Sequence, residues 1–122
     1  MGSPVAQFQM LSRNPERTAE FYSTLFGWTI GADNPLGYRQ IQTGAGRGID
    51  GGIWPAPPQA SAFVQLFIEV ADVDAAVAQA AALGANVIMP AQHLPHGETM
   101  AILQDVEGMS FGVYTPAAQA GA

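Results

Sequence analysis

Hydrophobic and polar residues alternate along two stretches of the chain, VAQFQML at 5–11 and VQLFIEV at 64–70. A period of two is typical of a β-strand with one buried face. Each stretch leads into a segment with helical spacing of its apolar residues, NPERTAEFYSTLFG at 14–27 and DVDAAVAQAAALG at 72–84. The same strand–helix succession is therefore predicted twice.

The ends of both helices are marked by residues that suit them. Asn14 and Asp72 are favourable N-caps, and Gly27 and Gly84 favour the left-handed backbone that ends a helix. Apolar residues at helical spacing are expected to face a sheet: Ala19, Phe21, Tyr22, Leu25 and Phe26 in the first helix, and Val73, Val77, Ala80 and Leu83 in the second.

Around each helix the pattern predicts the same set of strands. The first set lies near 4–11, 28–31, 38–43 and 48–54, and the second near 62–70, 85–89, 99–104 and 110–114. The proline-rich PAPPQAS at 55–61 suits a connector. We predict an α+β protein of two βαβββ modules, residues 1–57 and 58–122, that together form one domain. Each helix is expected to cover one face of its sheet, leaving the other faces of a mixed sheet to form a shared concave surface.

Strand alternation then assigns side chains to the two faces. The side chains expected on the helix-covered face are Phe8 and Met10 in the first module and Val64, Leu66, Ile68 and Val70 in the second. By the same alternation, Arg39 belongs to the helix-covered face of the first module. The candidate ligand-binding residues on the open face are Gln7, Gln9, Tyr38, Gln40, Trp54, Gln65, Phe67, Glu69 and Tyr114. Apolar walls with a few amide groups are typical of a small-molecule cleft. The alternative is a polar face that is simply open to solvent.

Charge excludes several classes of partner. The chain has ten acidic residues, only four arginines and no lysine, so its net charge is −6. This balance disfavours nucleic acid, anionic lipid and polyphosphate ligands. The absence of cysteine excludes disulfides and thiolate chemistry. No apolar run reaches the roughly 20 residues that cross a bilayer, and no secretory signal follows Met1, so no membrane partner and a cytoplasmic location are expected.

Two segments carry a family resemblance. FYSTLFGW at 21–28 and QDVEGMSFGVYTP at 104–116, in the frame of two βαβββ modules, resemble the vicinal oxygen chelate superfamily. This group includes glyoxalases, bleomycin-resistance proteins and extradiol dioxygenases, and the resemblance covers about residues 4–116. It implies a U-shaped cleft around a divalent metal, and modules that pair within or between chains. A homodimer is therefore expected.

The residues that stand where this family holds its metal depart from the pattern. Metal-binding members use the first and last strands of each module, and the matching positions here are Gln7, Gly52, Gln65 and Gly112. Neutral amides are weak ligands and glycine offers no side chain. We therefore predict no metal and no cofactor, with the glutamines acting as hydrogen-bonding groups for a small organic ligand.

Three hypotheses follow for the function. The first is a binding protein of the drug-sequestering or ligand-sensing kind, with aromatic stacking and a preference for neutral or cationic ligands. The second is a metal-dependent lyase, isomerase or dioxygenase that uses Asp50, Glu69 or the HLPHGE segment, in which His93, His96 and Glu98 have ligand-like spacing. The third is a metal-free enzyme with His93 or His96, both expected in a loop between strands, as general base; His93 is also a candidate ligand-binding residue at the mouth of the cleft.

Overall fold

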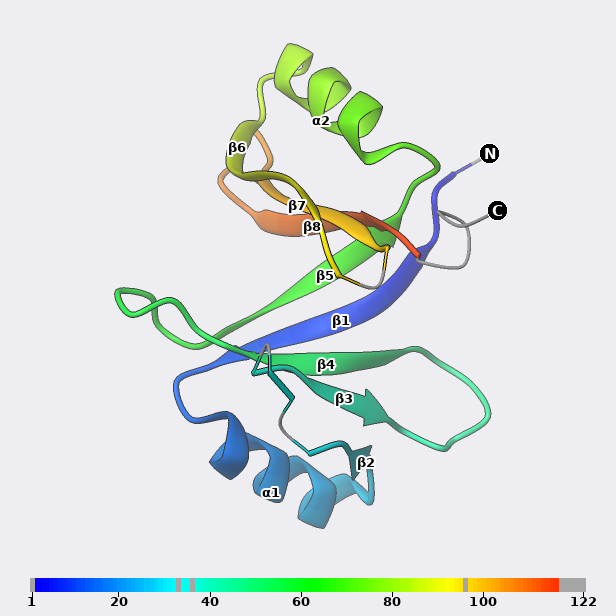
Figure 1. Ribbon diagram of the computed structural model, residues 1–122, viewed down its shortest axis with the longest axis vertical. Coiled ribbons are helices and arrows are strands. Elements are labelled where there is room, and N and C mark those ends of the chain that lie inside the picture. The colour runs from blue at the N-terminus through cyan, green and yellow to red at the C-terminus, as the bar shows by residue number, and fades with distance from the viewer. Residues whose placement is uncertain (1, 33, 36, 96, 117–122) are drawn as a thin grey trace. The chain divides into compact units, whose positions relative to one another are not determined.

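The elements of the fold follow the order strand, helix and three strands, twice. The computed structural model describes residues 2–32, 34–35, 37–95 and 97–116. The elements are β1 (Val5–Ser12), α1 (Pro15–Phe26), β2 (Thr29–Ile30), β3 (Arg39–Gln42), β4 (Asp50–Pro55), β5 (Phe63–Glu69), α2 (Val73–Ala82), β6 (Asn86–His93), β7 (Thr99–Gln104) and β8 (Ser110–Thr115) (Figure 1). The predicted α+β class with two βαβββ modules is confirmed.

The chain divides into two compact units. The N-terminal unit is Gln7–Gln65, and the C-terminal unit combines the start of the chain, up to Ala6, with the described residues from Leu66 onward. β1 and β5 thus each contribute residues to both units. The predicted module boundary between residues 57 and 58 stays a prediction.

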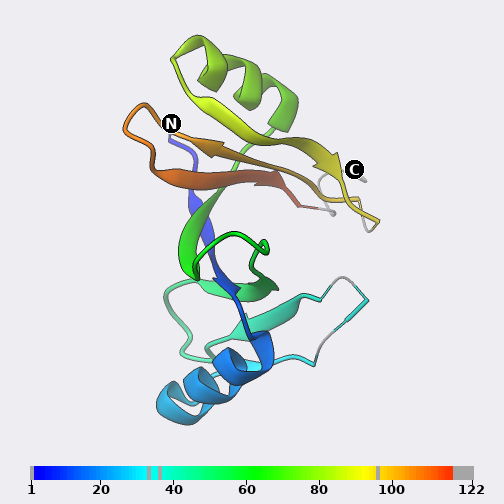
Figure 2. The same cartoon turned by 90° about the vertical axis from the view of Figure 1, so that its left-hand side faces the viewer.

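The N-terminal unit has its strands in the order β2-β3-β4-β1. β1 runs parallel to β4, whereas β3 is antiparallel to both β4 and β2. On the α1 side, Phe8 contacts Trp28 with ring centroids 5.7 Å apart, and Trp28 stacks on Tyr22 at 5.6 Å. Ile41 and Ile53 are fully buried. Figure 2 shows α1 alongside the strands of this unit.

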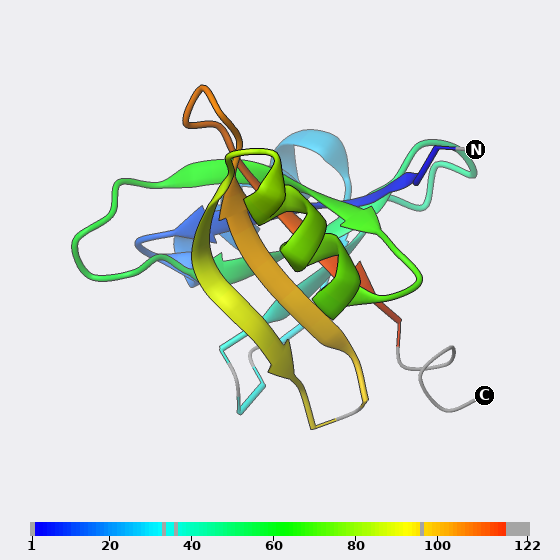
Figure 3. The same ribbon diagram turned by 90° about the horizontal axis from the view of Figure 1, so that it is seen from above.

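The C-terminal unit repeats this arrangement, in the order β5-β8-β7-β6. β5 is parallel to β8, and β7 is antiparallel to β8 and β6. Its buried core consists of Val73, Ala101, Leu103 and Val113, with Val77 and Ala80 of α2 packed against it. Figure 3 shows α2 lying across β6 and β7. The apolar side of this unit is therefore the α2 side, as the alternation predicts.

Both helices begin and end as the sequence predicts. The Asn14 side chain accepts a hydrogen bond from the Arg17 N–H at 3.1 Å, and Asp72 accepts one from the Ala75 N–H at 3.1 Å. Gly27 ends α1 in the left-handed conformation, with φ of 72°. These bonds satisfy backbone groups that the first and last turns leave without partners.

The predicted apolar stripe of α1 is wrong in part. Phe21, Leu25 and Phe26 are 58%, 57% and 57% exposed, and α1 has no buried residue. The reason is that α1 has apolar residues on more than one side, and Tyr22 and Trp28 supply the contact to the sheet. A helical period identifies apolar rows but does not say which row faces the strands.

Three further burial predictions are wrong. Val64 and Leu66 are 61% and 47% exposed, because β5 pairs with β8 only from Phe67 onward and the α2 core begins near Val70. Leu83 is 72% exposed because it is the C-cap, past the last turn of α2.

β6 is longer than predicted, since it continues through Pro90 to His93 with two register shifts against β7. No helix in the described part of the chain is long and apolar enough to cross a bilayer.

Candidate functional site

One face of the N-terminal unit gathers most of the candidate residues. Gly52 of β4 is in register with Gln9 of β1 on one side and with Gln40 of β3 on the other. Residues in register on neighbouring strands point to the same side of a sheet. Gln7, two residues before Gln9, and Trp54, two residues after Gly52, share this face. The structure thus brings these predicted residues together, on the face opposite Phe8 and α1.

Tyr38 occupies the space above Gly52. It lies immediately before β3, and its ring stands so close to Gly52 that a Cβ atom added there would clash with Cε1, Cζ and Oη. The phenol O–H donates to the Gly51 carbonyl at 3.3 Å, and the ring lies 4.6 Å from that of Trp54 at 42°. Glycine at position 52 is therefore required by the ring, and the ring fills the place of a side chain.

The glutamine pair on β1 is held together by its own amides. Gln9 Nε2 donates to Gln7 Oε1 at 2.6 Å, which confirms that the two side chains share a face. Gln9 is only 4% exposed, and its Oε1 atom has no hydrogen-bond partner among the described residues. A buried amide carbonyl without a partner is costly, so this atom requires an explanation.

The C-terminal unit carries a related arrangement. Phe67 of β5 is in register with Gly112 of β8, and an added Cβ at Gly112 would lie 2.5 Å from Phe67 Cε2. The Phe67 ring is 4% exposed and lies 6.2 Å from Tyr114. Glu69 is half-buried and in register with Tyr114, so these predicted residues share one face as well. Met100 and Ile102 of β7 are in register with Tyr114 and Gly112 and join them.

Of the remaining candidates, Gln65 is buried at 4% exposure and stands two residues before Phe67 on β5. His93 is exposed and is the last residue of β6, not a loop residue; its Nδ1 lies 3.0 Å from Thr99 Oγ1. His96 lies outside the described residues. The Glu98 carboxylate has one buried oxygen without a partner in the described structure.

The residues present do not fit the divalent metal that this fold implies. No group of three or more His, Asp or Glu side chains that could hold a metal occurs within the described residues. Gly52 and Gly112 supply no ligand, and aromatic rings fill the space that a ligand side chain would need. Asp50 uses its Oδ1 to accept from the Thr43 N–H at 3.0 Å, at the start of the β3–β4 loop.

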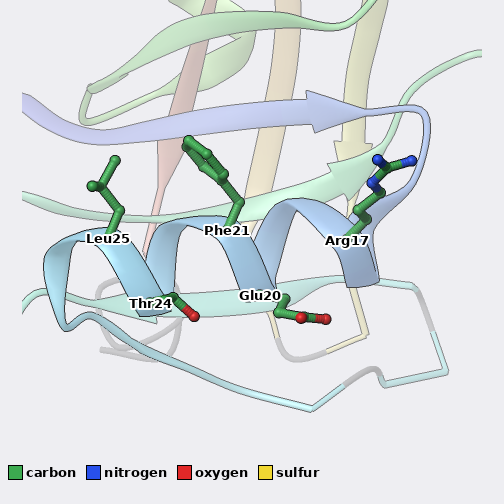
Figure 4. Close-up of a pocket in the computed structure, with 5 residues that line it drawn as sticks. All are labelled: Arg17, Glu20, Phe21, Thr24 and Leu25. Atoms are coloured by element: carbon green, nitrogen blue, oxygen red, sulfur yellow. The ribbon is translucent and has the colours of Figure 1, made fainter.

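A feature that the sequence did not predict as a site is an open hollow of about 730 Å³ along α1. Arg17, Phe21 and Leu25 project from one side of the helix, while Glu20 and Thr24 lie lower on it (Figure 4). The spacing of four residues between Arg17, Phe21 and Leu25 is the signal that could have indicated this row. Among the described residues a single helix provides the whole lining, so none of them brings a polar group to it from a second element.

The paired βαβββ topology defines the class of protein. Residues 7–114 match the model of the glyoxalase-like domain family. The chain belongs to this family, and the resemblance to the vicinal oxygen chelate superfamily is confirmed.

Curated relatives share this similarity over most of the chain. The candidate glyoxylase CFP32 of Mycobacterium bovis and that of Mycobacterium tuberculosis are each 30% identical over 114 residues, which is 91% of this chain. The match covers only 43% of either relative, so the chain spans less than half of their length.

Solved structures support the fold. Methylmalonyl-CoA epimerase from Mycobacterium tuberculosis superposes with a TM-score of 0.69 at 14% identity, covering 100% of this chain and 97% of that one. A variant of the Streptomyces coelicolor epimerase in complex with 2-nitronate-propionyl-CoA gives 0.66 at 19% identity, covering 95% and 96%. At these identities the likeness shows the fold alone.

Proposed function

We propose that this chain binds a small organic molecule on its glutamine- and aromatic-lined sheet faces without the help of a metal. The observation that carries the proposal is the aromatic ring seated on each glycine, Tyr38 on Gly52 and Phe67 on Gly112. These glycines stand where metal-binding members of the superfamily carry ligands. An aromatic surface there favours stacking in place of coordination.

The individual residues have distinct roles in this proposal. Trp54 and Tyr38 offer adjoining rings to a flat ligand. On the C-terminal unit the half-buried Tyr114 offers the ring, and Phe67, which is 4% exposed, packs beside it at 6.2 Å. The glutamine amides fix the ligand's orientation through hydrogen bonds. The net charge of −6 favours a neutral or cationic ligand over an anionic one.

The coenzyme A esters bound by the structural neighbours are poor candidates for this chain. Their phosphates call for cations, and the chain has four arginines and no lysine. Arg39 is in register with Ile53 and so lies on the α1 side, while Arg13 donates to the Ala60 carbonyl at 2.8 Å. Neither belongs to the proposed binding face of the N-terminal unit.

The direct test is metal content, measured by elemental mass spectrometry on untagged protein purified without chelator. A thermal-shift series with Ni²⁺, Zn²⁺, Mn²⁺ and Fe²⁺ follows. We expect less than stoichiometric metal and no ion-specific rise in melting temperature. A bound metal near one per chain would refute the proposal and support the second hypothesis, for which Glu69→Gln should then remove the metal.

A second test addresses the binding face itself. Trp54→Ala should abolish binding of a hit from a small-molecule screen, whereas Trp28→Phe, on the α1 side of the same unit, should leave it unchanged. An unaltered affinity in Trp54→Ala would show that the wrong face has been chosen. The homodimer and the cytoplasmic location stay predictions.

A further inference from the structure

We infer that a groove at the start of α1 binds a small organic acid, with its carboxylate on two arginines and its apolar body against an aromatic ring. This goes beyond the proposed function, because the groove lies along α1 and the proposed binding face is on the opposite side of the sheet. The groove has a volume of about 360 Å³, within the usual range of small-molecule sites. Its lining includes Arg13, Arg17, Thr18, Phe21, Tyr22 and Ala62.

Positive charge is concentrated at this groove. Two of the four arginines of the chain line it, whereas none of the ten acidic residues occurs among its described lining residues. The acidic residues of α1 are Glu16 and Glu20. Glu20 lines the adjoining hollow, and it lies lower on the helix than Arg17 (Figure 4). In a chain with a net charge of −6 the groove is a local exception, and charge complementarity selects an anionic group there.

Both guanidinium groups have donors left for a ligand. Arg13 Nη1 donates to the Ala60 carbonyl at 2.8 Å, which leaves its other N–H groups without a partner among the described residues. The Arg17 guanidinium has no hydrogen bond or ion pair within the described part of the chain. The Arg17 backbone N–H is capped by Asn14, so the guanidinium groups hold the anion. Both arginines are exposed and within reach of a ligand, and guanidinium N–H pairs match the two oxygens of a carboxylate.

The rest of the groove suits an apolar body. Ser12 Oγ lies 2.6 Å from Thr18 Oγ1 and also accepts from the Asn14 N–H at 3.0 Å, so these polar groups bond to one another. The Phe21 ring packs edge-to-face against Tyr22 at 5.0 Å and is 58% exposed. An uncovered ring gains from being covered by apolar ligand surface. The class of ligand is therefore a carboxylate that carries an aromatic or aliphatic group.

Four matched probes test this assignment: 3-phenylpropanoate, 3-phenylpropanamide, 3-phenylpropylammonium and propanoate. Their dissociation constants are measured from the α1 amide signals in ¹H–¹⁵N correlation spectra of the full chain. We expect 3-phenylpropanoate to bind about three- to tenfold more tightly than its amide, the value of two exposed ion pairs. The ammonium probe should bind more weakly than the amide. Propanoate should bind about fivefold or more weakly than 3-phenylpropanoate, because it has no ring to cover Phe21.

The decisive variants are Arg17→Gln and Arg13→Gln. Each should weaken the binding of 3-phenylpropanoate about threefold and leave that of its amide unchanged. Arg13→Gln also loses the bond to Ala60, whereas Arg17→Gln removes no side-chain hydrogen bond of the described structure and keeps the test valid if the first variant fails to fold. Arg47→Gln is the matched control, since Arg47 is an exposed arginine between β3 and β4 that does not line the groove.

The same spectra separate the groove from the proposed binding face. Binding should shift the backbone amide signals of Arg17 and Phe21 and leave the indole N–H signal of Trp54 in place. Shifts at Trp54 with none on α1 overturn the inference. Equal binding of the acid and its amide, or a preference for the acid that persists in Arg17→Gln, overturns it too. Probe binding that weakens as protein concentration rises would mean that a second copy of the chain covers the groove, and also overturns it.

Discussion

The contact between Phe67 and Gly112 makes a prediction that can be worked from the coordinates. In Gly112→Ala the new Cβ would lie 2.5, 2.6 and 2.8 Å from Phe67 Cε2, Cζ and Cδ2. Carbon atoms prefer a separation of about 3.5–4.0 Å, so the ring must move by about 1 Å. Phe67 is 4% exposed and has little room to do so.

The size of the effect follows from two opposing terms. Overpacking of this kind costs about 1–3 kcal/mol. Alanine regains about 0.5–1 kcal/mol over glycine within a strand because the unfolded chain is less free. The steric term wins, and we expect a net loss of about 1–2 kcal/mol, which lowers the melting temperature by about 4–8 °C for a chain of this size.

Urea denaturation followed by far-ultraviolet circular dichroism measures this loss. Gly31→Ala is the matched control, because its Cβ would meet the Gln40 backbone N and O atoms at an ordinary 3.7 Å, and a change within about 0.5 kcal/mol is expected. Phe67→Leu combined with Gly112→Ala should cost less than the sum of the single changes, by about 1 kcal/mol. Additive losses, or a Gly112→Ala variant as stable as the control, would refute the close contact between the Phe67 ring and Gly112.

Three further outcomes follow from the geometry. Gln9→Met should raise the free energy of unfolding by about 1 kcal/mol in urea titrations, because removing the unpaired carbonyl outweighs the lost bond to Gln7; a net loss would mean that the carbonyl is satisfied in solution. Asn14→Ala should cost about 1 kcal/mol by the same assay, since it removes the cap of α1, and Asn14→Asp should largely retain it. Phe21→Ser should lower the free energy of unfolding of the monomer by only about 1 kcal/mol, because the side chain is 58% exposed and loses chiefly its edge-to-face contact with Tyr22 at 5.0 Å; if sedimentation shows a dimer that this change disrupts, α1 lies in the interface.

Much of this architecture could be predicted from local signals in the sequence. The caps at Asn14 and Asp72 and the strand alternation located both helices, and seven of the eight strands, to within a few residues. The same alternation placed Gln7 with Gln9 and set Phe8 against them, and the hydrogen bond between the two amides confirms it. Such features depend only on neighbouring residues in the chain, so the local sequence pattern is enough to predict them.

The errors concern interactions between distant segments. The ring of Tyr38 reaches Gly52 only because β3 and β4 pair in one register, which no local pattern specifies. The strand predicted near 85–89 was too short. β6 continues through Pro90 to His93, and it is the outermost strand of its unit, where a missing N–H is tolerated. The orphan carbonyl of Gln9 likewise depends on what covers it, and burial of that kind is not encoded in spacing.

The rings on the two glycines also limit the mutational routes open to this chain. Introducing a glutamate at position 52 or 112, as a first step toward metal binding, meets a ring that already fills the space. The ring must shrink first, and that step alone removes packing and gains no ligand. The two units would also require different permissive changes. The ring comes from Tyr38 in the N-terminal unit and from Phe67 in the C-terminal unit. Phe67 is itself in register with Gly112, whereas the residue in register with Gly52 on the corresponding strand is Gln9. At these two positions, the first step toward a ligand side chain therefore lowers stability before a metal can compensate for it.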